Sequence, residues 1–341
     1  MKEIWPVVSV IMPTLNCASI LKECLGYVRA QDYDQSKLEI VIADANSTDD
    51  TVKVAKSFDA RVFKNPLLTS EAGKAVAVKE AKGEYFLFID SDNFIEEPDW
   101  LKRILEPMLA DKEVVGSEPL WYTYRHQDPL ISRYTAMMGL VDPAVFFTGN
   151  YDRMCLLSNT WTKLPIPYVD KPKWLELTLS KGKVPTLGSN GSLLRASIFD
   201  KAKVGEYLFD NDNISELAEK KPIKFTKVKI GIVHKFSATV RTFARKQRRR
   251  IKDFLYYSKV GMRTYQSNVS NRGLYIFIIY SVLIIPVILQ SFIGFAKKRD
   301  VAWFVHPLLC WVTLWVYGSE VILAKVRGVE IESRQGWQQT K

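Results

Sequence analysis

Hydrophobic positions in the first ninety residues follow two patterns, short continuous apolar runs and runs spaced for a helix. The apolar runs predict strands, and the helically spaced segments predict helices between them. Strands that alternate with helices favour an α/β fold with a mixed, mainly parallel sheet that helices cover on both faces. The predicted strands are residues 7–12, 38–43, 61–63 and 85–89. The predicted helices are residues 19–29, a helix from Asp49 with Ser47 and Asp50 spaced as a capping box, and residues 71–81.

Two uncharged apolar stretches near the C-terminus, residues 274–296 and 301–319, predict a transmembrane hairpin. Each is about as long as the roughly twenty residues that a helix needs to cross a bilayer. Basic residues flank the pair on both outer sides, so the positive-inside rule places these flanks and the N-terminal domain in the cytoplasm. We expect Pro286 to kink the first span and His306 to be an interfacial or packing residue. The alternative is a pair of buried core helices.

The formal charge of +11 is concentrated between residues 235 and 263, where there are ten Lys or Arg and one acid, Asp253. Seven side chains in and beside this stretch recur at helical spacing, namely Phe236, Val240, Phe243, Gln247, Ile251, Phe254 and Ser258. That pattern predicts an amphipathic helix lying in the headgroup layer. A basic run is also typical of nucleic-acid binding, but its position beside a predicted span favours anionic membrane lipids or the phosphates of a lipid-linked substrate.

Composition narrows the class of protein. A chain of 341 residues with 47% hydrophobic content buries a substantial core, which excludes a disordered protein. The four cysteines form no CxxC pair, so neither a disulfide framework nor a structural zinc site is expected, and a reducing compartment is the simplest interpretation. The N-terminus lacks the apolar core of a signal peptide, so we expect the first domain to remain on the side where it is made.

Acidic residues follow the predicted strand at 85–89. Asp90 and Asp92 present two carboxylates one residue apart, which repel each other unless a cation lies between them. Mg²⁺ or Mn²⁺ prefers such oxygen ligands and neutralises a diphosphate at the same time. Ligands of parallel sheets bind at the carboxyl ends of the strands, and this placement favours a metal site over a chance acidic loop.

Two further strand ends are expected at the same edge of the sheet. Pro13, Thr14 and Asn16 close the first strand, and Asp44 follows the second. Asp44 is a candidate for accepting a hydrogen bond from a base or ribose, with Thr14 at the other edge of the nucleotide. Turn chemistry explains Asp44 and Asn46 equally well, because both residue types tolerate tight turns.

Three segments with these residues occur in order, VSVIMPTLN at 8–16, EIVIADANSTDDT at 39–51 and GEYFLFIDSD at 83–92. Together they resemble family 2 glycosyltransferases with the GT-A fold, the nucleotide-diphospho-sugar transferase fold. The resemblance covers roughly the first 110 residues and resumes at 188–195 and 209–212. Residues 118–183 have no recognisable counterpart.

The resemblance implies roles for individual residues. Asp44 is implied to bind the nucleotide base, Asp90 the ribose or metal, and Asp92 the metal that bridges the diphosphate. Asp212 falls at the position of the catalytic base. His234 falls where several members place a further metal ligand, although a structural histidine at a strand end is the alternative. The candidate donor-binding residues are Pro13, Thr14, Asn16, Asp44, Lys74, Asp90 and Ser91, and the candidate ligands of Mg²⁺ or Mn²⁺ are Asp90, Asp92 and His234.

The chain departs from the family's pattern at two places. Ala45 and Asn46 replace the usual second acid and glycine after Asp44, although Asn46 can still adopt a left-handed turn. Asn211 replaces the usual Glu before Asp212, so the role of base rests on Asp212 alone.

These features predict an inverting, metal-dependent glycosyltransferase, multi-pass in the cell membrane with its catalytic domain on the cytoplasmic side. It would move a sugar from a UDP- or GDP-sugar to a hydroxyl of a lipid-linked saccharide or glycolipid, and no nucleic acid is expected as a partner. A polyprenyl phosphate is the alternative acceptor. The alternative of another class is an inactive basic protein that tethers to membranes or binds nucleic acid. The predicted domains are a catalytic domain at 1–235, an interfacial segment at 236–272, a transmembrane hairpin at 273–325 and a cytoplasmic tail at 326–341.

Overall fold

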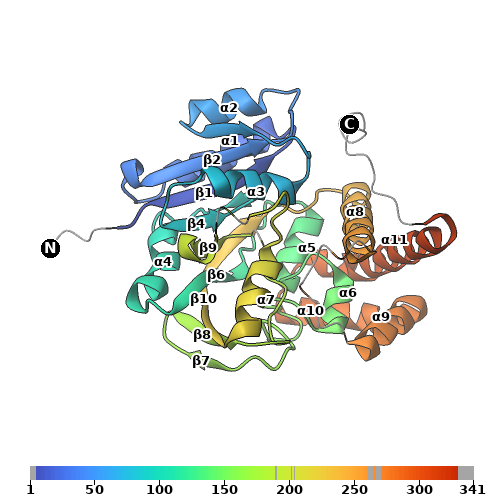
Figure 1. Ribbon diagram of the computed structural model, residues 1–341. Coiled ribbons are helices and arrows are strands. Elements are labelled where there is room, and N and C mark those ends of the chain that lie inside the picture. The colour runs from blue at the N-terminus through green and yellow to red at the C-terminus, as the bar shows by residue number, and fades with distance from the viewer. Residues whose placement is uncertain are drawn as a thin grey trace. The chain divides into compact units, whose positions relative to one another are not determined.

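A computed structural model of the chain describes residues 5–188, 190–200, 202, 204–259, 261, 265 and 270–328. These residues divide into two compact units (Figure 1). The first, called here the sheet unit, comprises residues 5–120 and 166–233, and the second, the helical unit, comprises residues 121–165 and 234–328. Residues 121–165 thus belong to the same unit as the C-terminal helices. The predicted domain boundaries stay predictions. The part of the predicted cytoplasmic tail that follows residue 328 lies outside the described residues.

The N-terminal half of the sheet unit is a parallel βαβ arrangement. β1 lies between β2 and β4 and pairs in parallel with both, and β2 pairs in parallel with β3. The strands are apolar and mostly buried because helices pack on them, α3 lying against β1 and β2. The predicted elements are confirmed to within two residues at the ends predicted for them. They are β1 Val8–Thr14, α1 Ala18–Arg29, β2 Leu38–Asp44, α2 Thr51–Ser57, β3 Arg61–Lys64, α3 Ser70–Glu80 and β4 Tyr85–Phe88.

The remainder of the sheet contains antiparallel pairs, which involve β9 and β8. Within the described residues, ten strands form one sheet in the order β3-β2-β1-β4-β9-β6-β10-β8-β7, with β5 beside β10. β9 runs antiparallel to β4 and β6, and β8 runs antiparallel to β10 and β7. The mixed sheet is confirmed, and the run β3-β2-β1-β4 is parallel throughout. The further elements are β5 Asn93–Phe94, α4 Trp100–Ala110, β6 Val114–Tyr122, β7 Tyr168–Asp170, β8 Trp174–Leu179, β9 Ser192–Arg195, α7 Asp210–Lys220 and β10 Ile223–His234, with short 3-10 turns at Gln35–Lys37 and Ala196–Ile198.

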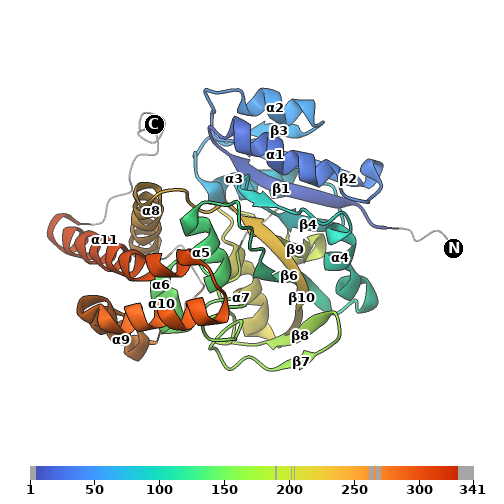
Figure 2. The same ribbon diagram turned by 180° about the vertical axis from the view of Figure 1, so that it is seen from behind.

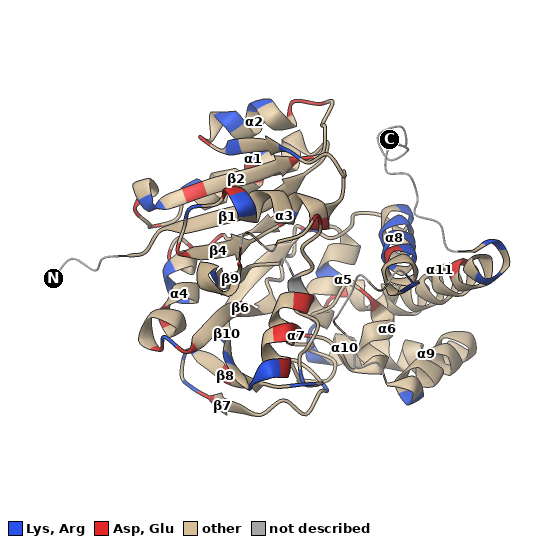
Figure 3. Ribbon diagram, in the orientation of Figure 1, with Lys and Arg blue, Asp and Glu red and all other residues tan. Residues whose placement is uncertain are grey.

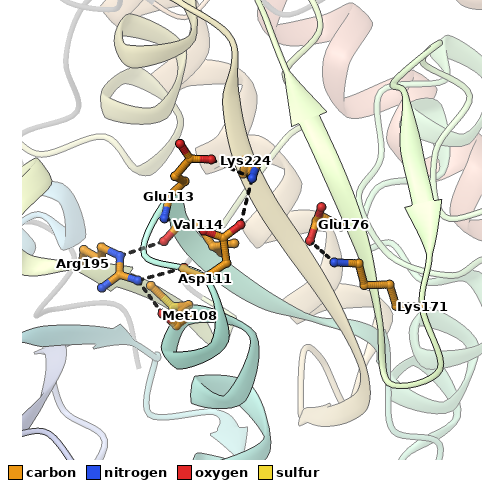
Figure 4. Close-up of polar contacts among 8 residues, drawn as sticks. All are labelled: Met108, Asp111, Glu113, Val114, Lys171, Glu176, Arg195 and Lys224. Atoms are coloured by element: carbon orange, nitrogen blue, oxygen red, sulfur yellow. Dashed lines mark hydrogen bonds and ion pairs between the residues drawn. The ribbon is translucent and has the colours of Figure 1, made fainter.

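Arg195, the last residue of β9, holds the turn between α4 and β6 (Figure 4). Its guanidinium donates to three carbonyls of this turn, those of Met108, Asp111 and Val114. Carbonyls at the end of a helix have no intrahelical donor, so the arginine satisfies groups that would otherwise need water. Lys224 of β10 adds an ion pair to Asp111 at 2.9 Å. Side chains from β9 and β10, the two strands that neighbour β6, therefore hold the start of β6 in place.

The helical unit packs around two apolar clusters, the larger of which contains Trp303. α9, α10 and α11 lie side by side in both views (Figures 1 and 2). Trp303 packs in the larger cluster with Tyr134 of α5 and Phe243 of α8. His306 is buried, with Nδ1 2.5 Å from the Tyr134 hydroxyl and Nε2 2.9 Å from Oε1 of Gln290, which confirms its packing role. The helices are α5 Leu130–Met138, α6 Pro143–Thr148, α8 Val240–Lys259, α9 Asn271–Leu283, α10 Ile285–Lys297 and α11 His306–Arg327, the last preceded by the 3-10 turn η3 at Val301–Val305.

One stretch of the described residues, Val301–Arg327, is long and apolar enough to span a membrane. The first predicted span, 274–296, is not a straight helix, because α9 and α10 meet at a bend of 95°. Ile284 at the bend has a φ of 62°, and Pro286 lies in the first turn of α10, where its missing N–H costs no hydrogen bond. The predicted kink is thus a sharp break, and a multi-pass hairpin is not supported.

The amphipathic helix predicted in the basic segment is α8. Its buried residues include Phe243 and Gln247, and Gln247 donates to the Val141 carbonyl at 2.6 Å. These two side chains, predicted on a face toward the membrane, contact protein instead, because α11 packs against α8 and supplies an apolar partner. Lys and Arg occupy much of α8 (Figure 3), and most of these residues are exposed.

Candidate functional site

Asp44 is fixed at the carboxyl end of β2, beside the end of β1. Its carboxylate accepts hydrogen bonds from the Thr14 hydroxyl at 2.9 Å, from the Ser47 N–H at 2.8 Å and from the Ser47 hydroxyl at 2.6 Å. Thr14 and Asp44 are directly paired in the sheet, and both are buried. Hydrogen bonds to a carboxylate are charge-assisted, so this arrangement presents Asp44 in one orientation.

The loops after β1 and β2 are joined to each other through Asn16, and each loop contains one asparagine in left-handed conformation. Asn16 has a φ of 46° and Asn46 a φ of 63°, so the left-handed turn predicted for Asn46 is confirmed. Oδ1 of Asn16 accepts from the Thr48 N–H at 2.8 Å, and the Asn16 N–H donates to the Ser47 hydroxyl at 2.9 Å. The predicted capping box is wrong, because α2 begins at Thr51 and Ser47 is engaged with Asp44 and Asn16.

The loop of Asp90, Ser91 and Asp92 follows β4 at the same edge of the sheet. β4 pairs in parallel with β1, so this loop leaves the sheet beside Thr14. The Asp90 N–H donates to Oδ1 of the buried Asn93 at 3.0 Å, and the Asn93 N–H donates to the Asp90 carbonyl at 3.0 Å. Asn93 therefore closes the turn, and the three side chains that precede it are half-buried.

Two thiols near α1 lie close to this acidic loop. Sγ of Cys24 is 3.9 Å from the Asp90 carbonyl oxygen. Burial raises the pKa of the Cys24 thiol well above its usual value, and the negative charges of Asp92 and Asp90 act in the same direction. Burial also raises the pKa of Cys17, although a hydrogen bond with Ser91 opposes the change. Both thiols stay neutral at pH 7, so the carboxylates carry the local charge.

The packing of α3 on β1 brings Pro13 next to Gly73, the residue before Lys74. A Cβ on Gly73 would lie 2.8 Å from Cβ of Pro13, so only glycine permits this approach. Nδ2 of Asn65 donates to the Thr69 carbonyl at 2.7 Å and holds the start of α3. Lys74, next to Gly73, is buried, which is unusual for lysine unless it is paired.

Asp212 lies in the first turn of α7 and is buried together with Asn211. The segment before α7 is tied to the start of α3, because the Leu208 N–H donates to the Glu71 carbonyl at 3.0 Å. The helices that carry Asp212 and Lys74 are therefore linked near their N-terminal ends within the sheet unit. A carboxylate in the first turn of a helix is stabilised by the exposed N–H groups and the helix dipole.

His234 ends β10 and belongs to the helical unit. Its ring lies 5.3 Å from that of Tyr122 and 5.5 Å from that of Phe236, centroid to centroid. In the part of the chain that the structure describes, no three side chains of His, Cys, Asp or Glu gather to hold a metal ion. Asp90 and Asp92 still offer hard oxygen ligands, and Mg²⁺ usually keeps waters and substrate phosphates as its other ligands. The donor set thus fits a divalent cation that binds with a diphosphate.

A buried ion pair, which sequence reasoning missed, supports the loop before β9. Nζ of Lys227 lies 2.5 Å from Oε2 of Glu118, and both side chains are 0% exposed. Oε1 of Glu118 accepts from the Ser192 hydroxyl and from the Gly188 N–H. The Gly191 N–H in the same loop donates to the Phe88 carbonyl at 3.0 Å, next to the acidic loop. The only sequence feature that points to this ion pair is Glu118 itself, a charged residue within the mainly apolar run at 114–122.

Comparison with known proteins relates part of this chain to glycosyltransferases. Residues 9–155 match the family described as Glycosyl transferase family 2, a region that includes Asp44, Asp90 and Asp92. The poly(ribitol-phosphate) β-N-acetylglucosaminyltransferase TarS of Staphylococcus aureus is 27% identical over 157 residues, which are 44% of this chain and 25% of that protein. The glycosyltransferase AglE of Haloferax volcanii is 29% identical over 142 residues, 40% of this chain and 46% of that protein. The chain thus spans less than half the length of these curated relatives.

Among solved structures, the mannosyltransferase PcManGT of Pyrobaculum calidifontis, in complex with GDP-Man and Mn²⁺, has a similar fold. The TM-score is 0.52 at 14% identity, over 96% of this chain and 88% of that one. At this identity the likeness concerns the fold alone. The chain therefore has an α/β, GT-A-like fold with a mixed sheet covered by helices. The relatives that match its sequence support the interpretation that it is a glycosyltransferase.

Proposed function

We propose that this chain is a glycosyltransferase that moves a sugar from a UDP- or GDP-sugar to an acceptor at the cytoplasmic face of the cell membrane. One observation carries the proposal. Thr14, Asp44 and the loop of Asp90 to Asp92 follow three adjacent parallel strands, inside the region that matches family 2. Nucleotides that bind parallel sheets do so at this edge.

Asp44 is the proposed contact to the base or ribose of the donor. Thr14 and Ser47 already hold its carboxylate, so binding requires no rearrangement of this side chain. Pro13 and Asn16 shape the adjoining loop, and Ser91 offers a hydroxyl beside the acids. Lys74 brings a positive charge from α3 toward the diphosphate.

Asp90 and Asp92 are the proposed ligands of Mg²⁺ or Mn²⁺, with His234 as a further candidate. Bound there, the cation would stabilise the charge that develops on the departing nucleoside diphosphate. The two half-buried carboxylates bind the cation and orient the donor beside Asp44.

Asp212 is the proposed general base. Its carboxylate takes the proton from an acceptor hydroxyl while that oxygen attacks the anomeric carbon from the face opposite the leaving group, which inverts the configuration. The neighbouring Asn211 cannot act as a base because an amide is not basic. The first turn of α7 holds Asp212 in place.

The proposed acceptor is a hydroxyl of a lipid-linked saccharide or glycolipid. The apolar stretch Val301–Arg327 and the basic helix α8 both support a location at a membrane. Because α8 is rich in Lys and Arg, a polyprenyl phosphate is the second candidate acceptor. Its oxygen is already ionised, so Asp212 would then orient the acceptor.

The test is to incubate the purified chain with UDP-, GDP- and dTDP-sugars and a native lipid extract, and to identify the product by mass. We expect a glycosylated lipid from one donor, and a loss of about 10²- to 10⁴-fold in Asp212→Asn. Glu216→Gln, on the same helix, is the matched control and retains the rate. Unimpaired transfer by Asp212→Asn would favour the phosphate acceptor, and no product from any donor would contradict the proposed activity.

A further inference from the structure

An apolar stripe lies on the exposed side of η3 and α11. Its members recur at spacings of three, four or seven, which places them on one face of a helix. Trp311 and Trp315 are 49% and 66% exposed, and their rings stack at 6.3 Å. α9 and α10 expose further large apolar side chains, among them Ile279, Ile285 and Leu289. The stripe on η3 and α11 consists of Phe304, Leu308, Trp311, Trp315, Ile322 and Val326.

The N-terminal end of α11 is held by residues from the first part of the helical unit. The Tyr124 hydroxyl donates to the carboxylate of Asp300, and NH1 of Arg133 lies 3.4 Å from the same carboxylate. Nζ of Lys297 donates to the carbonyls of Leu156 at 3.0 Å and Leu157 at 2.8 Å. The connection between α10 and α11 is therefore bound to residues 124–157.

The C-terminal half of α11 is held by α8 and by the residue before α6. Glu320, only 7% exposed, pairs with Nε of Arg248 at 2.8 Å and with Nζ of Lys252 at 3.9 Å. The Tyr317 hydroxyl oxygen lies 2.5 Å from Oδ2 of Asp142 and 3.0 Å from Oε1 of Gln247. A carboxylate inside a bilayer is costly, so Glu320 marks this part of α11 as lying at the level of the basic helix.

The connectivity of the chain determines on which side of the membrane each segment lies. Between residues 123 and 165 the helices are α5 with 9 residues and α6 with 6, each far shorter than the roughly twenty residues of a span. Residues 124–157 therefore stay on the side where β6 ends. α8 follows β10 after a short connection and is on that side as well. Because α11 is bound to this set near both ends, its two ends lie on the same side.

We propose that α9, α10 and α11 enter a single leaflet of an anionic bilayer and do not cross it. The apolar stripe contacts acyl chains, and the exposed Lys and Arg of α8 contact the headgroups (Figure 3). The 95° bend between α9 and α10 lets the chain turn back within the leaflet. A bilayer fits this face better than a second copy does, because two copies would bring the basic helices together. The inference rests on the proposed function, which supplies a membrane-bound acceptor.

Labelling of single cysteines tests this arrangement without using transfer activity. Three exposed positions are replaced one at a time, Lys112→Cys in the sheet unit, Arg299→Cys between α10 and α11, and Arg327→Cys at the end of α11. The background is Cys17→Ser, because the other three thiols are buried. An impermeant maleimide is applied to sealed inside-out vesicles and to intact spheroplasts of the expression host.

The proposal predicts that all three cysteines react in inside-out vesicles and none in spheroplasts. Labelling of Arg299→Cys from the opposite face would establish a transmembrane hairpin, and labelling of Arg327→Cys alone from that face would establish a single span. Either result overturns the proposal, as does recovery of the parent chain in the soluble fraction. The labelling pattern does not depend on whether the chain transfers a sugar, so it fails or succeeds separately from the proposed function.

A second measurement tests the surface itself, by flotation of the purified chain with vesicles of phosphatidylglycerol or of phosphatidylcholine. We expect tighter binding to the anionic vesicles and roughly tenfold weaker binding for Trp315→Ser. Tyr168→Ser, which removes a 52% exposed aromatic from the sheet unit, is the matched control and binds as the parent does. Unchanged vesicle binding of Trp315→Ser together with loss of a dimer would assign the stripe to a second copy and overturn the proposal.

Discussion

Breaking the buried ion pair of Glu118 and Lys227 should destabilise the sheet unit strongly. Neither side chain is exposed, and their charged atoms lie 2.5 Å apart. Glu118→Gln removes the carboxylate that lies beside the buried ammonium group of Lys227, and removing one partner of a buried ion pair costs about 3–5 kcal/mol of unfolding free energy. At about 2–4 °C per kcal/mol for a unit of this size, the melting temperature should fall by roughly 6–20 °C.

The double variant Glu118→Gln with Lys227→Met distinguishes a charge effect from lost packing. Gln still accepts hydrogen bonds from Ser192 and Gly188, and no charge is left uncompensated. We therefore expect the double variant to melt above Glu118→Gln alone, with a coupling energy of about 1–3 kcal/mol between the two sites.

Lys229→Met is the matched control on the same strand. Lys229 pairs with Asp170 at 2.6 Å, but the side chain of Asp170 is 63% exposed. A surface pair contributes about 0–1 kcal/mol, so this variant should melt within a few degrees of the parent. The assay is thermal unfolding in detergent followed by tryptophan fluorescence. The reasoning is refuted if Glu118→Gln melts no lower than Lys229→Met, or if the losses of Glu118→Gln and of the single variant Lys227→Met simply add in the double variant.

Asp44→Asn replaces a carboxylate that three donors hold, and we expect nucleoside diphosphate affinity to fall by about 10- to 100-fold, measured by equilibrium binding; unchanged affinity would remove Asp44 from the donor site. Gly191→Ala should destabilise the protein by about 1–3 kcal/mol, because φ is +87° and the new Cβ would lie 2.9 Å from Cδ1 of Ile232; an unaltered melting temperature would contradict this. For Glu39, burial raises the pKa, but hydrogen bonds from Ser9, the Lys82 N–H and Arg61 outweigh it and hold the pKa below its usual value. The ionised Glu39 carboxylate therefore stabilises the folded protein fully above the unfolded pKa of about 4.3, and this stabilisation is lost as pH falls through the lower pKa of the folded state. The difference in melting temperature between the parent and Glu39→Gln should be largest at pH 7 and shrink below about pH 4.

The sequence predicts the N-terminal half of the fold well because local patterns determine it. Apolar runs and helical spacing fix β1 to β4 and the helices between them, and parallel strands bring their carboxyl ends together. The placement of Asp44 and Asp90 at one edge follows from that rule alone. The hydrogen bonds that orient Asp44 could not be predicted, since they depend on turn geometry at Asn16 and Asn46.

Contacts between distant segments are the part that the sequence does not reveal. Glu118 and Lys227 meet across strands whose order in the sheet is not apparent from either segment. The hydropathy pattern gives the length of the C-terminal apolar stretches. It does not reveal the bend at Ile284 or the hydrogen bonds that Lys297 donates to the carbonyls of residues 156 and 157. For this reason the hairpin predicted from composition differs from the arrangement in the structure.

Calorimetric titration of the purified chain with UDP and GDP, in Mn²⁺ and after chelation with EDTA, tests the central claim most directly. The claim is that the carboxylates following β4 hold a divalent cation against a nucleoside diphosphate whose base lies at Asp44. We predict binding of one nucleotide with Mn²⁺, at least tenfold weaker binding after chelation, and the same loss in Asp92→Asn with Mn²⁺ present. Equal affinity of parent and Asp92→Asn, with and without the cation, would contradict the account.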